Sequence, residues 1–226
     1  MYKYVILSQK TWNNQLVEKL QAKFPSDSFM QIAAKEEFTA EKLQNIKPDK
    51  IFIPHWSYII PESIFANYEC IVFHMTDLPF GRGGSPLQNL IVRGIKQTKI
   101  SALRVEKGLD TGDIYLKKDL PLYGTAEEIY LRASGIIEDM IVEIINDNLQ
   151  PKPQTGEPVL FTRRKPADSD MAQLDDINTI YDYIRMLDAE GYPHAYLENN
   201  SIRYEFSRVS MKADGSLVAD VKIYKK

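Results

Sequence analysis

A histidine and a group of glycines stand close together about one third of the way along the chain. His74 ends an apolar run, and Gly81, Gly83 and Gly84 surround Arg82 a few residues later. A histidine at the carboxyl end of a buried strand is well placed for proton transfer, because open α/β sheets bind ligands at that edge. The glycines allow a tight backbone path, and a helix that begins just after them would offer free N–H groups to an anion. A structural histidine and an ordinary turn would use the same residues, so position suggests a function without deciding it.

A second polar loop follows later in the chain. Residues 105–115 read Val-Glu-Lys-Gly-Leu-Asp-Thr-Gly-Asp-Ile-Tyr. Asp-Thr-Gly also occurs in aspartic proteases, but that chemistry needs two carboxylates that face one another, and this chain has one such tripeptide. We therefore exclude an aspartic protease, and a simple turn remains the alternative for this loop.

The motifs of several other enzyme classes are absent. No glycine-rich dinucleotide fingerprint follows the first apolar run, and there is neither a Walker-type phosphate loop nor a nucleophile elbow. Cys70 lies in an apparent buried strand, where a thiol is usually inert. With one cysteine and three histidines, neither an internal disulfide nor a metal site is expected.

Length, composition and charge narrow the class of protein. The 226 residues are 44% hydrophobic and 26% charged, which is enough for one full-sized domain with a packed core. The formal net charge is −3 with both signs well mixed, so the electrostatic footprint of a nucleic-acid-binding protein is missing. No apolar run is long enough to span a bilayer, and no signal-peptide cleavage site follows the first one. We therefore expect a cytoplasmic protein with neither a membrane nor a nucleic acid as partner.

The elements that must position the two loops follow an α/β pattern. Short apolar runs alternate with amphipathic stretches, as in a mostly parallel sheet with crossover helices. We expect strands at residues 3–7, 28–32, 50–54, 69–73, 99–105 and 113–120, and helices at residues 11–24, 39–46 and 85–94. Thr125 and Glu128 have capping-box spacing and open the clearest helix of the chain.

The last third of the chain differs in character. Regular structure is expected to stop at residues 148–158, where three prolines and a glycine occur without periodicity. A helix at residues 176–186 and alternating segments at 201–209 and 217–224 then predict a small β-rich subdomain. We therefore predict a main domain over residues 1–160 and a C-terminal subdomain over residues 161–226. The subdomain has a net charge of −1, so we expect it to bind RNA poorly.

Together, the two loops resemble those of the folate-dependent formyltransferases. In that family a segment of the type His-x-Ser-Leu-Leu-Pro is followed by Arg-Gly-x-x-Pro, and a Gly-Leu-Asp-Thr-Gly-Asp loop comes later. The corresponding places are taken here by His74, Pro79, Arg82, Gly83, Pro86 and Asp110. The spacing of 36 residues from His74 to Asp110 is also similar to that of the family. Residues 53–61 resemble the loop before the catalytic strand, and residues 161–166 resemble the start of the family's C-terminal subdomain.

The resemblance implies a Rossmann-like formyltransferase domain and transfer of a formyl group from 10-formyltetrahydrofolate to an amine. Attack of an amine on a formyl carbon leaves a surplus proton and a developing oxyanion, so the site needs a proton acceptor and hydrogen-bond donors. His74 would shuttle the proton and help to hold the oxyanion, while Asp110 would orient its ring. The family's third catalytic residue, an asparagine two positions before the histidine, is Val72 here. Either Asn89 or backbone N–H groups replace its amide, or the chain is a folate-binding pseudoenzyme.

The resemblance also suggests where the folate and the acceptor bind. The residues implied to line the pterin pocket are Trp56, Ser57, Tyr58, Thr76, Asp77, Leu78, Pro79, Glu106, Lys107, Gly108 and Leu109. Arg82, with Gly83 and Gly84 beside it, is the natural partner of a phosphate or carboxylate of the substrate, because guanidinium binds such anions with two parallel hydrogen bonds. The alternative for Arg82 is a structural contact that holds its own loop.

The choice of acceptor depends on weaker features. A short C-terminal subdomain with a net charge of −1 argues against tRNA, and its presence argues against glycinamide ribonucleotide. The variant His-Met-Thr-Asp-Leu-Pro is similar to sugar N-formyltransferases of nonulosonic-acid (pseudaminic-type) and other surface-sugar pathways. We therefore expect a nucleotide-linked amino sugar as the acceptor, with methionyl-tRNA or another small amine as the alternative. A homodimer is compatible with the sequence.

Overall fold

The computed structural model describes residues 1–226, which divide into two units. The first unit comprises residues 1–83, 98–120 and 131–160. The second unit comprises residues 84–97, 121–130 and 161–226. Each unit therefore combines segments that are distant in the sequence.

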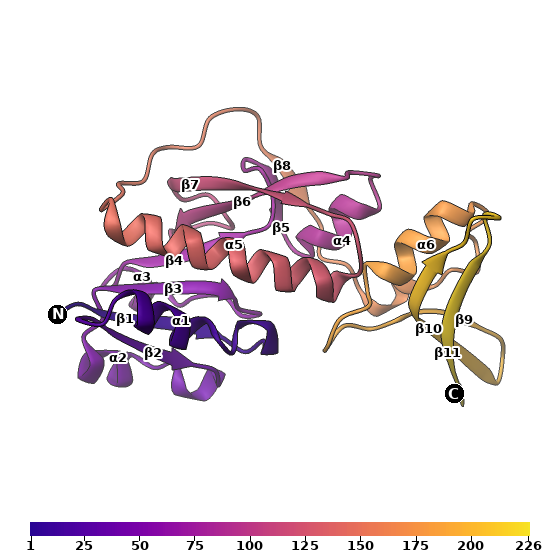
Figure 1. Ribbon diagram of the computed structural model, residues 1–226, viewed down its shortest axis with the longest axis horizontal. Coiled ribbons are helices and arrows are strands. Elements are labelled where there is room, and N and C mark those ends of the chain that lie inside the picture. Colours follow the sequence, from indigo (N-terminus) through magenta and orange to yellow (C-terminus); the bar gives the residue numbers. More distant parts are fainter. The chain divides into compact units, whose positions relative to one another are not determined.

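A six-stranded sheet with the order β2-β1-β3-β4-β6-β7 is the centre of the first unit (Figure 1). Its strands are β1 (Lys3–Ser8), β2 (Ser28–Ile32), β3 (Lys50–His55), β4 (Cys70–His74), β6 (Gln97–Arg104) and β7 (Ile114–Pro121). β1 runs parallel to β2 and β3, β3 runs parallel to β4, and β4 is antiparallel to β6. The predicted α/β fold with a mostly parallel central sheet is confirmed.

The central strands are apolar along their length because side chains on both faces of the sheet are buried. Val5, Ile6 and Leu7 are consecutive in β1 and fully buried, as expected for a parallel sheet covered on both sides. The helices of this unit are α1 (Leu16–Lys23), α2 (Ala40–Ile46), α3 (Glu62–Phe65) and most of α5 (Ala126–Asn146). The predicted capping box of α5 is present: Thr125 N–H donates to Glu128 Oε2 at 2.8 Å and Glu128 N–H donates to Thr125 Oγ1 at 3.3 Å.

The second unit contains a small antiparallel sheet. Its order is β11-β10-β9, with β9 (Ala195–Glu198), β10 (Ile202–Met211) and β11 (Leu217–Lys225). The helices of this unit are α4 (Pro86–Ile91) and α6 (Ile177–Arg185), and α6 packs against β10 (Figure 1). The predicted β-rich C-terminal region is confirmed.

Two short strands are not among the elements that the sequence predicts. β5 (Phe80–Gly83) falls in the glycine-containing segment and pairs with β8 (Val159–Phe161). Between α5 and β8 the chain has little regular structure, as predicted, but it is not a detached linker. Lys152 and Ile114 exchange backbone hydrogen bonds of 2.8 and 2.9 Å. The segment is attached because β7 is an edge strand whose outer backbone groups need partners.

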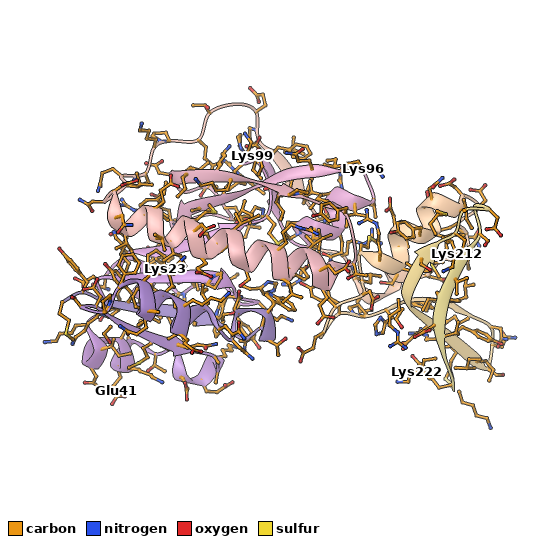
Figure 2. All side chains as sticks on the ribbon, viewed as in Figure 1. Lys23, Glu41, Lys96, Lys99, Lys212 and Lys222 are labelled. Atoms are coloured by element: carbon orange, nitrogen blue, oxygen red, sulfur yellow. The ribbon has the colours of Figure 1, made fainter.

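None of the helices combines the length and apolar composition that crossing a membrane would require. Charged side chains are spread over the surfaces of both units, in agreement with the mixed charge pattern of the sequence (Figure 2). Labelled examples are Lys23, Glu41 and Lys99 in the first unit and Lys96, Lys212 and Lys222 in the second.

Candidate active site

His74 is the last residue of β4, and its side chain is 8% exposed. The ring is held by a backbone group, because its Nε2 atom lies 2.7 Å from the carbonyl oxygen of Gly81. A carbonyl oxygen only accepts, so Nε2 carries the proton in the neutral ring. Nδ1 is then the basic nitrogen of His74.

Asp110 reaches this basic nitrogen from the loop between β6 and β7. Its Oδ2 atom lies 3.6 Å from His74 Nδ1 and accepts the backbone N–H of Gly83 at 2.9 Å. The Asp110 side chain is 13% exposed, so its attraction to a protonated ring is screened less than that of a surface pair. The structure therefore brings together the two residues that the sequence singled out for proton transfer.

The loop that carries Asp110 depends on unusual backbone conformations. Gly108 has φ 114° and Asp110 has φ 53°, and aspartate is one of the few non-glycine residues that tolerate this region. A Cβ atom at Gly112 would lie 1.9 Å from the carbonyl oxygen of Arg104, so only glycine fits there. The loop closes with a hydrogen bond of 2.9 Å from Arg104 N–H to the Asp113 carbonyl. These requirements explain the two glycines on either side of Asp110.

Arg82 is held by a residue that sequence reasoning missed. Gln154 Oε1 accepts from Arg82 Nε at 3.2 Å and from Nη2 at 2.8 Å. The Nε2 group of the same glutamine donates to the carbonyl oxygens of Asp110 and Gly112 at 2.9 and 2.8 Å. Gln154 lies in the stretch without periodicity, where no sequence signal marks it. The structure thus gives Arg82 a loop-holding contact through Nε and Nη2 of its guanidinium.

The segment from Thr76 to Pro79 is fixed by two further residues that the sequence did not single out. Ser101 Oγ donates to the Thr76 carbonyl at 2.7 Å and accepts from Leu78 N–H at 3.3 Å. Lys117 Nζ lies 2.6 Å from Asp77 Oδ1 and also donates to the Leu78 carbonyl. This part of the predicted pterin pocket is therefore held by buried or half-buried polar contacts.

An apolar wall lies on the His74 face of the sheet. Val72 precedes His74 by two residues on β4, so the two side chains point to the same face. Val72, Trp56 and Val105 are partly buried and pack against the hydrophobic cluster of this face. Val72 thus adds apolar surface where the family asparagine would add an amide donor.

The remaining residues predicted for the pterin pocket lie on exposed loop surface. They are Ser57, Tyr58, Glu106, Lys107, Gly108 and Leu109. Tyr58 is 43% exposed and Leu109 is 61% exposed. The centroids of the Tyr58 and Trp56 rings are 5.6 Å apart. The Tyr58 ring also has Lys35 against it, with Nζ 4.5 Å from the ring centroid.

Asn89 and Gly84 belong to the second unit, where both have local partners. Asn89 Nδ2 lies 2.9 to 3.1 Å from three carbonyl oxygens, those of Gly84, Ser85 and Thr162. Both N–H groups of this amide are therefore used within the unit, and none is left for an oxyanion. Gly84 is required by packing, because a Cβ atom there would lie 2.5 Å from Arg163 Cβ.

Two other titratable residues of the sheet, Cys70 and His55, are not suited to proton transfer at neutral pH. Burial, with a contribution from Glu69, raises the pKa of the Cys70 thiol to about 12. Burial, followed by the charge of Lys10, lowers the pKa of His55 to about 4. Cys70 is therefore a protonated packing residue, as predicted, and His55 is a neutral ring.

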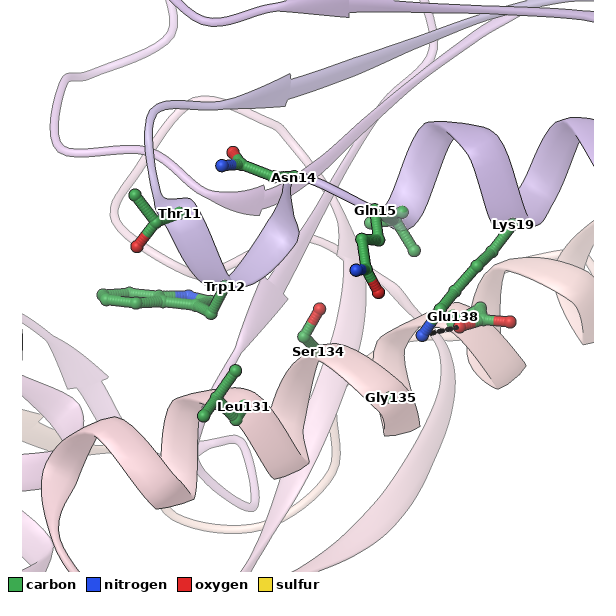
Figure 3. Close-up of a pocket in the computed structure, with 10 residues that line it drawn as sticks. Thr11, Trp12, Asn14, Gln15, Lys19, Leu131, Ser134, Gly135 and Glu138 are labelled. Atoms are coloured by element: carbon green, nitrogen blue, oxygen red, sulfur yellow. Dashed lines mark ion pairs between the residues drawn. The ribbon is translucent and has the colours of Figure 1, made fainter.

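A separate groove of about 400 Å³ lies in the first unit and has neither His74 nor Asp110 in its lining (Figure 3). Side chains of α1, of the turn before it and of α5 line it, and Lys19 Nζ pairs with Glu138 Oε2 at 3.4 Å across it. Gly135 forms part of its lining, and a Cβ atom there would meet no other atom within 4 Å. The sequence did not indicate this groove.

Two family models match the chain. Residues 5–143 match the model described as "Formyl transferase", and residues 166–224 match the model described as "Methionyl-tRNA formyltransferase, C-terminal domain". The chain belongs to the formyl transferase family. This membership confirms the predicted family and the prediction of a formyltransferase-type enzyme.

Individual relatives and solved structures show the extent of the likeness. A solved methionyl-tRNA formyltransferase from Clostridium thermocellum is 53% identical with a TM-score of 0.97, and the match covers 100% of both chains. A curated methionyl-tRNA formyltransferase from Rickettsia bellii is 33% identical over 136 residues, which are 58% of this chain and 45% of the relative. The chain thus spans about half the length of the curated relatives it matches. HypX from Aquifex aeolicus, solved in complex with tetrahydrofolic acid, has a TM-score of 0.74 at 18% identity over 92% of this chain and 38% of its own, a likeness of fold alone.

These comparisons overturn the predicted acceptor. The sequence favours a nucleotide-linked amino sugar over the alternative, methionyl-tRNA, and argues against nucleic acid as a partner, because the C-terminal subdomain is short and has a net charge of only −1. However, the Clostridium protein has the same extent and is named a methionyl-tRNA formyltransferase, and the subdomain matches a C-terminal model of that name. The predicted sugar acceptor and the prediction against nucleic acid are therefore wrong, and the comparisons favour the alternative acceptor, methionyl-tRNA. Net charge misled here because it says nothing about how the charges are placed on a surface.

Proposed function

We propose that this protein transfers the formyl group of 10-formyltetrahydrofolate to the amine of the methionyl group on methionyl-tRNA. The full-length match to a methionyl-tRNA formyltransferase at 53% identity supports this acceptor. The approach of His74 Nδ1 and Asp110 Oδ2 to 3.6 Å is the observation that carries the chemistry. Both side chains are largely buried, and each is also held by a backbone group.

The residues beside His74 fit a reduced folate. A pterin ring has flat apolar faces and an amide-like edge, so it needs an apolar wall and polar backbone groups. Trp56, Val72 and Val105 provide such a wall, and the loops after β4 and β6 provide carbonyl and N–H groups. When bound, the folate supplies the formyl group that the amine takes up. The loop residues from Thr76 to Pro79 and from Glu106 to Leu109 would hold it.

His74 takes the proton that the attacking amine releases. The Gly81 carbonyl holds the proton of the neutral ring on Nε2, which leaves the Nδ1 lone pair as the base. Once protonated, the ring is a cation whose positive charge stabilises the oxygen on which negative charge develops. This second role matters because Val72 has no donor to offer.

Asp110 makes the protonated ring more stable. Its carboxylate faces Nδ1 in a largely buried site, where the attraction between opposite charges is stronger than in water. The Gly83 N–H keeps this carboxylate in place whether or not the ring is charged. Asp110 is therefore a fixed negative charge that favours proton transfer to His74.

We assign Arg82 the role of binding the phosphate of the acceptor that lies nearest to the site. Gln154 contacts Nε and Nη2 of the guanidinium, which leaves the Nη1 group for an anion of the substrate. Gly81 and Gly83 on either side of Arg82 keep the backbone there free of side chains. A guanidinium that is already oriented binds phosphate with a smaller loss of conformational entropy.

A direct assay tests the proposed function. The purified protein is given 10-formyltetrahydrofolate and methionyl-tRNA, and formylmethionine is measured after the ester is hydrolysed. We expect formylation that requires the folate and disappears in His74→Ala. Uncharged tRNA and free methionine serve as controls for the acceptor.

Two outcomes would contradict the proposal in different ways. Tetrahydrofolate release that depends on another amine, without formylation of methionyl-tRNA, would overturn the acceptor and keep the chemistry of His74 and Asp110. No release with any amine, although the folate still binds, would overturn the enzyme and favour the pseudoenzyme that Val72 suggested.

A further inference from the structure

Gln154 connects the two loops that carry the candidate catalytic and anion-binding residues. Its Oε1 atom accepts from Nε and Nη2 of Arg82, and its Nε2 group donates to the carbonyls of Asp110 and Gly112. The four distances lie between 2.8 and 3.2 Å. One side chain thus uses its acceptor on one loop and its two N–H groups on the other.

The Asp110 loop needs an anchor of this kind. Residues 106–109 are exposed, so little packing holds the first half of the loop. The Asp110 side chain is tied at Oδ2 by Gly83 N–H, but the direction of its Cα–Cβ bond depends on the backbone on either side. The carbonyls that Gln154 binds lie on either side of Thr111, so the contacts fix the peptide groups that follow Asp110.

The segment that carries Gln154 is itself well fixed. Lys152, two residues before, exchanges two backbone hydrogen bonds with Ile114. Val159 N–H, on the other side, donates to the Pro79 carbonyl at 3.1 Å. Gly156 lies between these points, and a Cβ atom there would touch the Pro79 ring at 3.7 Å. Gln154 therefore reaches the site from a backbone that is attached on both sides.

We infer that Gln154 is a positioning residue for formyl transfer, which sets Asp110 against His74 and orients Arg82. The inference rests on the proposed function, because it concerns the same site. Glutamine suits the role since only a primary amide presents one acceptor and two N–H donors within a single group of this size. A carboxylate would keep the contact with Arg82 and place negative charge against two carbonyl oxygens.

The first test compares steady-state formylation by four proteins. They are the wild type, Gln154→Ala, Gln154→Glu and the control Gln150→Ala, which changes an exposed glutamine of the same segment whose Nε2 contacts only the nearby Asn148 carbonyl. We expect kcat to fall about ten- to a hundredfold in both Gln154 variants, because a misplacement of about 1 Å costs about that much. The KM for the folate and the melting temperature should change little. Gln150→Ala should behave like the wild type.

A double-mutant cycle separates positioning from general damage. If Gln154 acts through Asp110, then Gln154→Ala should lower the residual kcat of Asp110→Asn by less than about threefold. If Gln154→Ala lowers the kcat of Asp110→Asn by the same factor as it lowers the kcat of the wild type, the inference is overturned. Unchanged kcat in Gln154→Ala and Gln154→Glu would also overturn it.

A second readout does not depend on activity. In the folate-free protein, the ring NMR signals of His74 report on the carboxylate beside it. We expect them to shift in both Gln154 variants and to stay in place in Gln150→Ala. Unshifted His74 signals would contradict the inference even if turnover falls. If the wild type transfers no formyl group while the His74 signals do shift, the proposed function fails and the positioning of Asp110 by Gln154 stands.

Discussion

Asp110 Oδ2 lies 3.6 Å from His74 Nδ1 and, at the same time, 2.9 Å from the backbone nitrogen of Gly83. The distance to His74 Nδ1 is longer than a hydrogen bond, whereas the distance to the Gly83 nitrogen is that of a normal hydrogen bond. The carboxylate is therefore held by the backbone rather than by the ring. The gap to His74 leaves room for the pair to tighten when the ring takes up a proton, as catalytic hydrogen bonds often do when substrate binds.

Replacing either partner should reduce turnover strongly. We expect His74→Ala and Asp110→Asn each to lower kcat by about a hundred- to ten-thousandfold, the range typical of a lost general base. In Asp110→Asn the amide oxygen can still accept from Gly83, so the loop should remain folded while the negative charge is lost. Rapid-quench measurement of formyl transfer under single-turnover conditions checks this. Losses below about tenfold in both variants would show that the pair is not the proton-transfer site.

The loop of Asp110 should not tolerate a side chain at residue 112. In Gly112→Ala the new Cβ atom would overlap the Arg104 carbonyl, so the loop must move. We expect a loss of stability of about 1 to 3 kcal/mol, as for other overpacked positions, together with lower turnover. Urea unfolding followed by circular dichroism measures the first effect. Unchanged stability and turnover would mean that the loop conformation described above is wrong.

Gly135→Ala is the matched control, and we expect it to raise the stability that Gly112→Ala lowers. Gly135 lies inside α5, and a Cβ atom there would meet nothing within 4 Å. A helix with alanine at an interior position is more stable than one with glycine by about 0.5 to 1 kcal/mol, because alanine loses less backbone entropy than glycine on folding. We therefore expect a higher urea midpoint with unchanged formylation. A destabilised Gly135→Ala would show that the groove beside it has no room for a methyl group.

Cys70 should react with thiol reagents only after unfolding. The residue is 1% exposed, and burial raises the pKa of its thiol to about 12, so the thiolate is both scarce and shielded. We expect native protein to resist iodoacetamide at pH 8 and protein in urea to be alkylated, as followed by mass spectrometry. Rapid alkylation of the native protein would instead place Cys70 at an accessible and reactive site.

His55 should make the fold sensitive to mild acid. Its pKa is about 4 in the folded protein against 6.5 for the ordinary group, so the unfolded chain binds the proton first as the pH falls. The stabilisation from the neutral ring is fully present above about pH 6.5 and is lost as the pH falls through about 4. The total loss of unfolding free energy from this group over the pH range is about 3 kcal/mol. We expect His55→Gln to flatten the decline of unfolding free energy between these pH values; an equally steep decline would assign the acid sensitivity to other groups.

The errors of the sequence-based analysis concern properties that are not local. The sugar acceptor was inferred from the length and net charge of residues 161–226, neither of which describes a binding surface. Asn89 was a candidate donor because it is near His74 in sequence, whereas the structure places it in the second unit with three carbonyl partners of its own. Nearness along the chain was a poor guide because it does not show which partners an amide group has.

The sequence by itself determined the elements and the chemical character of the site. Apolar runs such as Val5 to Leu7 predict buried strands, the spacing of Thr125 and Glu128 predicts a capping box, and the residue types at His74 and Asp110 predict proton transfer. These signals can be read from the chain because each depends on neighbours in sequence, through side-chain periodicity, capping or turn geometry. Only the tertiary structure decided which nitrogen of His74 is basic, that Gly83 holds Asp110, and that Gln154 joins Arg82 to the Asp110 loop. Such contacts join residues far apart in the chain, and no periodic pattern records them.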